Sequence, residues 1–144
     1  MAKSYTRKTA KTKIATLEKE IEELKIIANQ PANLFEIIEN YTDVCEELGI
    51  EELTEKDFNS KKEFRYHQIK NIEELFNCDW KVNINNINQQ KFYPYYNIRN
   101  GRLVFDVSFC NYGYSFDGQI ALYKDKATSD FIGKKFIYIY ENLI

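Results

Sequence analysis

The sequence KFYPYYNIRNGRLVFDVSFC, residues 91–110, contains the most specific structural signal in the chain. Its centre is Asn100-Gly101, a pair that readily adopts the two positive φ angles of a type I′ turn. The residues on both sides are rich in aromatic and β-branched side chains, which favour extended strands. We therefore predict an antiparallel hairpin, with one strand over Phe92–Ile98 and a return strand over Leu103–Cys110.

Alternation along the two strands predicts which side chains share a face of the hairpin. In the first strand, Tyr93 and Tyr95 should lie on the face opposite Phe92 and Tyr96. A small sheet buries one face well, so some of the tyrosines should stay exposed. In the return strand, the residues expected to share one face are Leu103, Phe105, Val107 and Phe109.

Exposed tyrosines beside arginines form the candidate partner-binding surface. Tyr and Arg are enriched at the centres of protein interfaces, and aromatic side chains also stack on single-stranded nucleic acid. The simpler interpretation is that the aromatics reflect β-propensity and fill a helix-covered core. Of the two binding functions we favour protein contact, because an acidic segment elsewhere in the chain would repel nucleic acid. The candidate residues are Tyr93, Tyr95, Arg99, Arg102, Tyr112 and Tyr114.

The chain after the hairpin predicts one more strand and a closing helix. Residues 120–123 should form the third strand of an antiparallel meander. Thr128 or Ser129 should cap the final helix, whose apolar stripe includes Ile132 and Phe136. An alternative is that the β-rich run 136–140 forms a fourth strand.

Two helices are expected between residue 33 and the hairpin. Apolar residues recur at helical spacing from Leu34 to Leu48, and Gly49 follows at a position that requires positive φ. Ser60 and Glu63 have the spacing of a capping box, which predicts a further helix that ends near Asn77.

A separate amphipathic helix is predicted over residues 14–30, with Pro31 ending it. Its apolar residues follow spacings of three and four, which is the pattern of a coiled-coil seam. Two heptads are few for a coiled coil, so the helix either packs on its own domain or pairs with another chain, for example as a homodimer. The candidate self-association residues are Ile14, Leu17, Ile21 and Leu24.

These elements predict an α+β fold with N-terminal helices, a small antiparallel β-meander and a C-terminal helix packed on the sheet. The length of 144 residues fits one domain. We divide the chain into a basic flexible arm over 1–13, the heptad helix over 14–30, and a single α+β domain over 33–144.

Charge is distributed in blocks, although the net charge is only −2. Residues 1–13 carry +5, residues 14–57 carry −10 and residues 58–144 carry +3. The first block is a solvated terminus or an arm that contacts RNA or an acidic partner. The basic residues of the arm are Lys3, Arg7, Lys8, Lys11 and Lys13. The candidate acidic docking surface consists of Glu46, Glu47, Glu51, Glu52, Glu55 and Asp57.

Several classes of function are not favoured by the sequence. No apolar run has the length of a membrane span, and no export signal is recognisable, so a cytoplasmic protein is expected. The one histidine, His67, and three cysteines have no zinc-site spacing. We therefore predict no catalytic site, no metal site and no cofactor, and free thiols at Cys45, Cys78 and Cys110.

Three segments resemble a group of small proteins encoded by phages and prophages of Bacteroidetes, most of them without an assigned function. The segments are Asp43–Ile50, Lys91–Tyr96, and Phe131–Phe136 with the ending Tyr140–Ile144, so that the resemblance covers roughly residues 34–144. It implies a phage accessory or virion protein and assigns no site residues.

These observations lead to three functional hypotheses. The first is a non-enzymatic phage or mobile-element protein that inhibits a host defence nuclease of the CRISPR type, by contact with the protein and with its guide RNA. The second is a virion or assembly component that oligomerises through the heptad helix. The third is a nucleic-acid-binding regulator that uses the basic arm and the tyrosines of the sheet.

Overall fold

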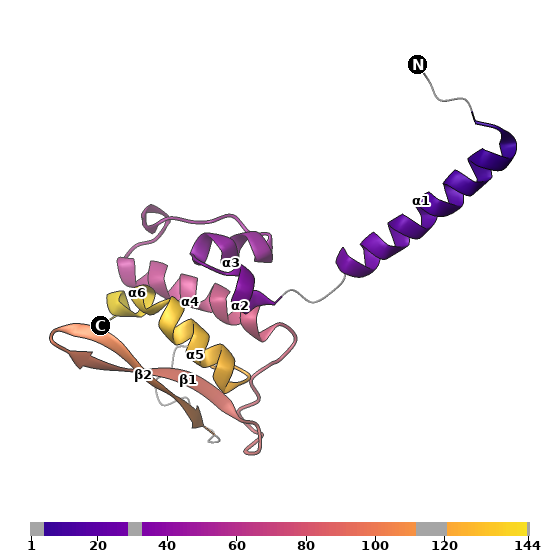
Figure 1. Ribbon diagram of the computed structural model, residues 1–144. Coiled ribbons are helices and arrows are strands. Elements are labelled where there is room, and N and C mark those ends of the chain that lie inside the picture. Colours follow the sequence, from indigo (N-terminus) through magenta and orange to yellow (C-terminus); the bar gives the residue numbers. More distant parts are fainter. Residues whose placement is uncertain (1–4, 29–32, 112–120, 144) are drawn as a thin grey trace. The chain divides into compact units, whose positions relative to one another are not determined.

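The computed structural model describes residues 5–28, 33–111 and 121–143. The chain divides into two compact units, Met1–Asn33 and Leu34–Ile144. The described residues of the second unit form helices before and after an antiparallel pair of strands, and the C-terminal helix packs on the sheet (Figure 1). The predicted α+β fold is confirmed.

The first unit contains the helix α1, Arg7–Ala28. It begins seven residues before the predicted start at Ile14, because Thr6 caps it: the Thr6 hydroxyl accepts a hydrogen bond from the backbone N–H of Thr9 at 3.2 Å. Residues 7–13 of the predicted flexible arm are therefore helical. Lys3 lies outside the described residues.

The second unit opens with two short helices where the sequence spacing suggested one. They are α2, Leu34–Ile37, and α3, Tyr41–Leu48. Asn40 separates them with a capping box, in which its side chain accepts from the N–H of Asp43 and the Asp43 carboxylate accepts from the N–H of Asn40, both at 3.1 Å. Gly49 ends α3 with a φ of 66°, as predicted.

The long helix α4, Lys61–Asn77, follows a short 3₁₀ helix η1, Glu55–Asp57. Ser60 caps α4 by accepting from the N–H of Glu63 at 3.1 Å, so the predicted start and end of this helix are confirmed. The buried face of α4 includes Ile69, Ile72 and Phe76. Together with Ile38, directly after α2, and Val44 of α3, this face forms one wall of the core.

The predicted hairpin is formed by β1, Lys91–Arg99, and β2, Arg102–Asn111. Asn100 and Gly101 have φ angles of 52° and 74°, as the type I′ turn requires. The predicted third strand over 120–123 is reduced, within the described residues, to a single bridge between Phe92 and Tyr123.

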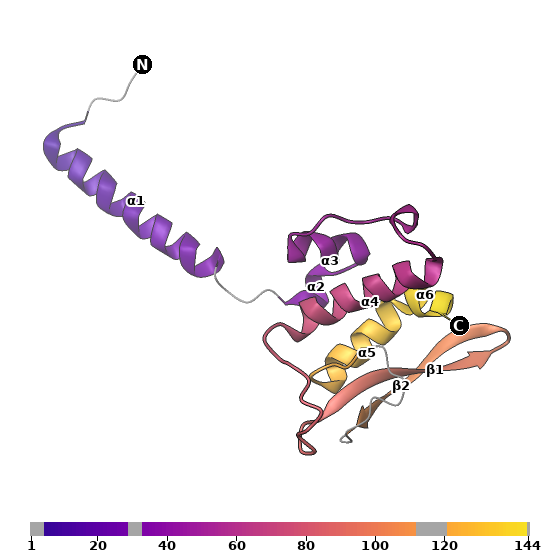
Figure 2. The same ribbon diagram turned by 180° about the vertical axis from the view of Figure 1, so that it is seen from behind.

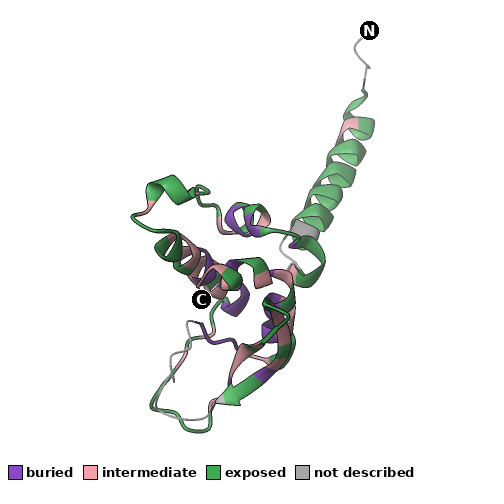
Figure 3. Cartoon of the chain, turned by 90° about the vertical axis from the view of Figure 1, so that its left-hand side faces the viewer, coloured by how far each residue is buried: buried purple, intermediate pink, exposed green. Residues whose placement is uncertain are grey.

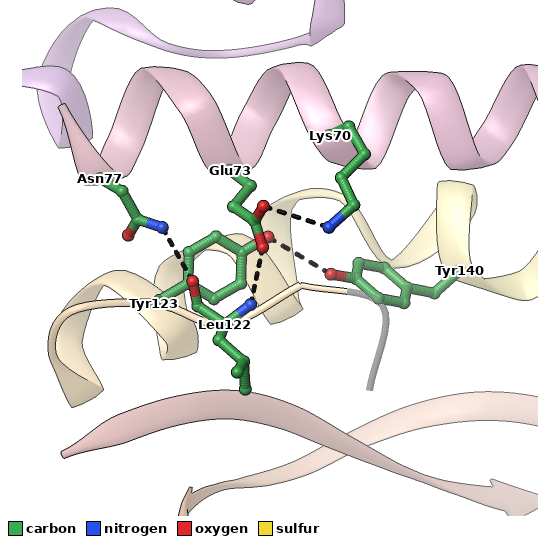
Figure 4. A network of polar contacts seen from close by, with 6 residues as sticks. All are labelled: Lys70, Glu73, Asn77, Leu122, Tyr123 and Tyr140. Atoms are coloured by element: carbon green, nitrogen blue, oxygen red, sulfur yellow. Dashed lines mark hydrogen bonds and ion pairs between the residues drawn. The ribbon is translucent and has the colours of Figure 1, made fainter. Parts of the chain in front are cut away.

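The reason is that side chains of α4 bind the backbone around Tyr123 (Figure 4). The Asn77 side chain donates to the carbonyl of Leu122 at 2.8 Å and accepts from the N–H of Lys124 at 3.2 Å. The Glu73 carboxylate accepts from the N–H of Leu122 at 2.8 Å. Because these backbone groups bond to α4, they are not available for a longer strand ladder.

The C-terminal segment forms α5, Lys126–Lys135, then α6, Ile137–Tyr140, and the 3₁₀ turn η2, Glu141–Leu143. The cap of α5 is Asp125, which accepts from the N–H of Thr128 at 2.7 Å, and not Thr128 or Ser129 as predicted. Thr128 and Ser129 instead lie within α5, and both are buried. The alternative of a fourth strand over 136–140 is wrong, because this run is helical.

Helix α5 lies across the hairpin and separates it from α4 (Figures 1 and 2). Buried residues of α3, α4 and α5, with Ala121 and Tyr123, form one hydrophobic core. Figure 3 shows the buried segments of these elements in purple. Helix α5 approaches the sheet closely at Gly133, where an added Cβ would lie 2.6 Å from ring atoms of Phe105 and 2.8 Å from Pro94 Cβ.

Candidate protein-binding surface

A β-bulge in β2 determines which side chains share each face of the hairpin. Tyr95 pairs with Val107 and Tyr96 pairs with Phe105, so Asp106 is the extra residue between them. Val107 and Phe109 therefore lie on the face opposite Phe105. The prediction that Leu103, Phe105, Val107 and Phe109 share one face is wrong, because the bulge interrupts the alternation on which it was based.

The inner face of the hairpin packs on α5. The Tyr96 hydroxyl donates to the carbonyl of Gly133 at 2.8 Å, and the Ser108 and Ser129 hydroxyls are 2.7 Å apart. Burial raises the pKa of the Tyr96 phenol well above its ordinary value. These contacts fix the inner face and leave the opposite one turned away from α5.

Three aromatic side chains on that opposite face, Tyr93, Tyr95 and Phe109, form what we call the outer aromatic cluster. The ring centroids of Tyr95 and Phe109 are 4.9 Å apart with an edge-to-face orientation, and those of Tyr93 and Phe109 are 6.1 Å apart. Tyr95 is 42% exposed and Phe109 is 44% exposed. Large aromatic rings are thus held in a fixed arrangement with much of their surface open to solvent.

Two arginines extend the same face at the turn end of the hairpin. Arg99 and Arg102 are directly opposite one another and exposed. The Asn97 side chain lies between them and the cluster, and donates to the Asp106 carboxylate at 2.8 Å. Since Arg99 is four residues beyond Tyr95 in an extended strand, the arginines begin about 13 Å away.

The structure thus brings four of the predicted partner-binding residues, Tyr93, Tyr95, Arg99 and Arg102, to one face. The other two, Tyr112 and Tyr114, lie outside the described residues. The predicted partner-binding residues did not include Phe109, which was expected to share a face with Leu103, Phe105 and Val107. A signal for the bulge was present in Pro94, which cannot donate a ladder hydrogen bond, but it did not locate the extra residue.

At the other end of this face, Lys91 is almost completely buried. Its ammonium group donates to the backbone carbonyls of Asn86 and Gln89, at 3.2 and 3.0 Å. Residues of the preceding loop therefore cover the start of β1. The solvent-facing part of this face consequently begins at Tyr93.

All six residues of the predicted acidic docking surface are exposed. Glu46 and Glu47 lie in the last turn of α3, and Glu55 and Asp57 lie in η1. The Asp57 carboxylate has a structural role as well, since it accepts from the N–H of Thr54 at 2.7 Å. The acidic residues are on other elements than the outer aromatic cluster, so the two surfaces are distinct.

The residues with catalytic potential have structural contacts. A ring nitrogen of His67 is 3.1 Å from the side-chain amide of Asn71, which is neither an acid nor a base near neutral pH, and the His67 ring packs on Phe58. Cys45 is buried, and desolvation raises the pKa of its thiol, which disfavours the reactive thiolate. Over the described ranges, no group of three or more His, Cys, Asp or Glu side chains is arranged to hold a metal ion.

Comparison with known proteins gives no family for the chain: no family model, no curated protein and no solved structure matches it. Among the helices in residues 5–28, 33–111 and 121–143, none has the length and apolar character that crossing a membrane requires.

Proposed function

We propose that this protein is a non-enzymatic binding protein that contacts a protein partner through the outer aromatic cluster. The observation that supports the proposal is the geometry of Tyr93, Tyr95 and Phe109, which pack against one another while Tyr95 and Phe109 remain exposed. Rigid, partly exposed aromatic residues are the typical anchors of protein interfaces, since they bury a large area at a small cost in side-chain entropy.

The surroundings of the cluster favour a protein over a nucleic acid. An acidic side chain, Asp106, accepts a hydrogen bond from Asn97, which lies next to the cluster on the same face. A stacking platform for single-stranded nucleic acid lies in a positively charged groove that follows the phosphates. Within the described residues, Arg99 and Arg102 lie together at the turn end of this face, so they do not form a basic groove along the cluster.

More specifically, we propose that the protein inhibits a host defence nuclease. It would be encoded by a phage or mobile element and act in the cytoplasm of the host cell. The resemblance of residues 34–144 to small phage proteins motivates this form. A nuclease has a basic nucleic-acid groove, and the exposed carboxylates of α3 and η1 provide a complementary second contact.

Affinity capture from a Bacteroidetes host lysate, with and without nuclease treatment, tests this function. The proposal predicts that the wild-type chain retains a nuclease or its ribonucleoprotein and still does so after nuclease treatment. The variant Tyr95→Ser/Phe109→Ser should lose it, and the exposed double variant Glu22→Gln/Glu23→Gln should not. Recovery of no nuclease would overturn the inhibitor form, and recovery only through intact nucleic acid would favour the nucleic-acid-binding regulator.

A second candidate function is favoured by α1. Its apolar residues Ile14, Leu17, Ile21 and Leu24 are between 42% and 64% exposed. Such a row is the type of surface that an assembly component uses to oligomerise. An assembly component of this kind requires that α1 pairs with α1 of a second copy of the chain.

A further inference from the structure

The helix α1 has the residue pattern of a two-stranded parallel coiled coil, which we refer to as the heptad seam: Ile14, Leu17, Ile21 and Leu24. All four side chains of this seam are exposed. In heptad notation, Ile14 and Ile21 occupy a positions and Leu17 and Leu24 occupy d positions. Ile at a with Leu at d favours two parallel strands over three or four. The a position one heptad earlier is Arg7, so the apolar layers begin at Ile14.

The charges that flank the seam fit a second copy of the same helix. The g residues are Lys13 and Glu20, and the e residues are Glu18 and Lys25. In a parallel, in-register pair, each g residue faces the e residue five positions further on in the partner helix. Lys13 then faces Glu18, and Glu20 faces Lys25, so that each helix contributes two attractive pairs.

The antiparallel arrangement of the same helix is disfavoured by the same charges. There, e residues face e residues and g residues face g residues when the apolar layers are matched. Glu18 would meet Glu18 of the partner helix, and Glu20 would meet Glu20. Like charges placed directly opposite one another oppose that arrangement.

The remaining charges do not compete for these four side chains. The ion pair recorded within residues 5–28 is Lys19–Glu23, at 4.0 Å. It lies at f and c positions, which are away from the seam. Lys13, Glu18, Glu20 and Lys25 are therefore free to pair between chains.

We infer that the protein forms a parallel, in-register homodimer through α1, in which Lys13–Glu18 and Glu20–Lys25 pairs connect the two helices. The second units of both chains then follow from the same end of the paired helices. A dimer of this kind offers two copies of the outer aromatic cluster to a partner and increases the apparent affinity for any partner that has two sites. The inference specifies the pairing that the second candidate function needs, and its failure would leave the outer aromatic cluster unaffected.

Sedimentation equilibrium of the full chain tests the dimer. We expect a monomer–dimer equilibrium, and we expect Ile21→Glu to raise the dissociation constant at least ~100-fold, because it removes an a-layer residue from both helices. The matched control is Ile26→Glu: Ile26 is 58% exposed on the same helix but occupies an f position. It should change the constant by less than about two-fold. A wild-type chain that stays monomeric, a trimer, or equal losses in both variants would overturn the inference.

A charge exchange tests the register. Glu20→Lys should weaken the dimer about ten-fold at low salt, since it turns two attractions into repulsions. The double variant Glu20→Lys/Lys25→Glu should restore it. Residues five apart do not face one another on a single helix, so a restoration identifies a contact between chains. A double variant as weak as the single one would contradict the register.

Cysteine cross-linking tests the orientation, in a chain whose exposed thiols are removed by Cys78→Ser and Cys110→Ser. In a parallel dimer, Ile14→Cys alone and Leu24→Cys alone should each form an intermolecular disulfide on mild oxidation. If a disulfide forms only when the two variants are mixed, the helices are antiparallel and the inference is wrong.

Discussion

Asn77, the last residue of α4, connects segments that are far apart in the sequence. Its buried side chain donates a hydrogen bond to the carbonyl of Leu122 and accepts one from the N–H of Lys124. Both groups belong to the segment that joins the hairpin region to α5. Together with the Glu73 carboxylate, which accepts from the N–H of Leu122, this amide supplies hydrogen-bond partners to backbone groups that a longer third strand would have paired.

We expect Asn77→Ala to lower the free energy of unfolding by about 2–3 kcal/mol, because it leaves two backbone groups without a partner. Chemical denaturation of the full chain measures the change in the free energy of unfolding. Asn85→Ala, in an exposed position, is the control and should change the free energy by less than about 0.5 kcal/mol. Equal effects of the two substitutions would show that the Asn77 contacts do not stabilise the fold.

Gly133 permits the close contact between α5 and the sheet. An alanine in a helix is normally more favourable than a glycine, but here the new methyl group would overlap Phe105 and Pro94. We expect Gly133→Ala to destabilise the protein by about 1–3 kcal/mol.

A double-mutant cycle with Phe105→Leu identifies the cause. The smaller side chain should recover part of the loss, so that the two substitutions are coupled. Additive effects would mean that the contact with Phe105 is not responsible.

At the scale of single elements, the hairpin depends on a turn that only some residues can form. Gly101 has a φ of 74°, where an L side chain is strained. We expect Gly101→Ala to cost about 1–2 kcal/mol in thermal or chemical unfolding. Gly101→Asn should cost less, because asparagine tolerates the left-handed region. If alanine is tolerated as well as asparagine, the turn does not constrain the hairpin.

The elements whose signals are local could be predicted from the sequence. Ser60 with Glu63 predicted the start of α4, Gly49 the end of α3, and Asn100-Gly101 the turn, because each effect acts within a few residues. The break between α2 and α3 was missed, although Asn40 and Asp43 form a capping box, because the apolar spacing continues across it.

The elements that depend on distant contacts could not be predicted in this way. The third strand is reduced by side chains of α4 that are more than forty residues away in the sequence. The bulge at Asp106 places Val107 and Phe109 on the opposite face from the one that simple alternation predicts, so Phe109 joins the candidate surface. The position of the bulge depends on the pairing of the two strands and not on either strand alone. Tyr93 and Tyr95 were placed correctly, since β1 alternates without interruption.

At the scale of the whole molecule, the buried tyrosines make stability depend on pH in the alkaline range. Burial raises the pKa of Tyr41, Tyr96, Tyr123 and Tyr140, in the last case to about 12. The unfolded chain releases these protons above about pH 10, while the folded chain retains them. The free energy of unfolding is therefore unaffected by these groups at neutral pH and falls as the pH rises above that value.

Each such tyrosine lowers the free energy of unfolding by up to about 1.4 kcal/mol per pH unit between its unfolded and folded pKa values. Denaturation at a series of alkaline pH values, followed by circular dichroism and tyrosinate absorbance, measures the loss. We expect the buried phenols to ionise only together with unfolding. Their ionisation in a chain that is still folded would contradict the burial described here.

We expect the outer aromatic cluster to contribute most of the binding free energy for the partner, and the acidic residues of α3 and η1 to make a minor, peripheral contact. The most direct test is a calorimetric titration of the captured partner with matched variants. We expect Tyr95→Ala/Phe109→Ala to raise the dissociation constant at least ~30-fold, as for truncated hot-spot residues. The variant Glu46→Gln/Glu47→Gln should raise it less than about five-fold, as for charges at the rim of an interface. An unchanged constant for the aromatic variant, with a large loss for the acidic one, would contradict the account.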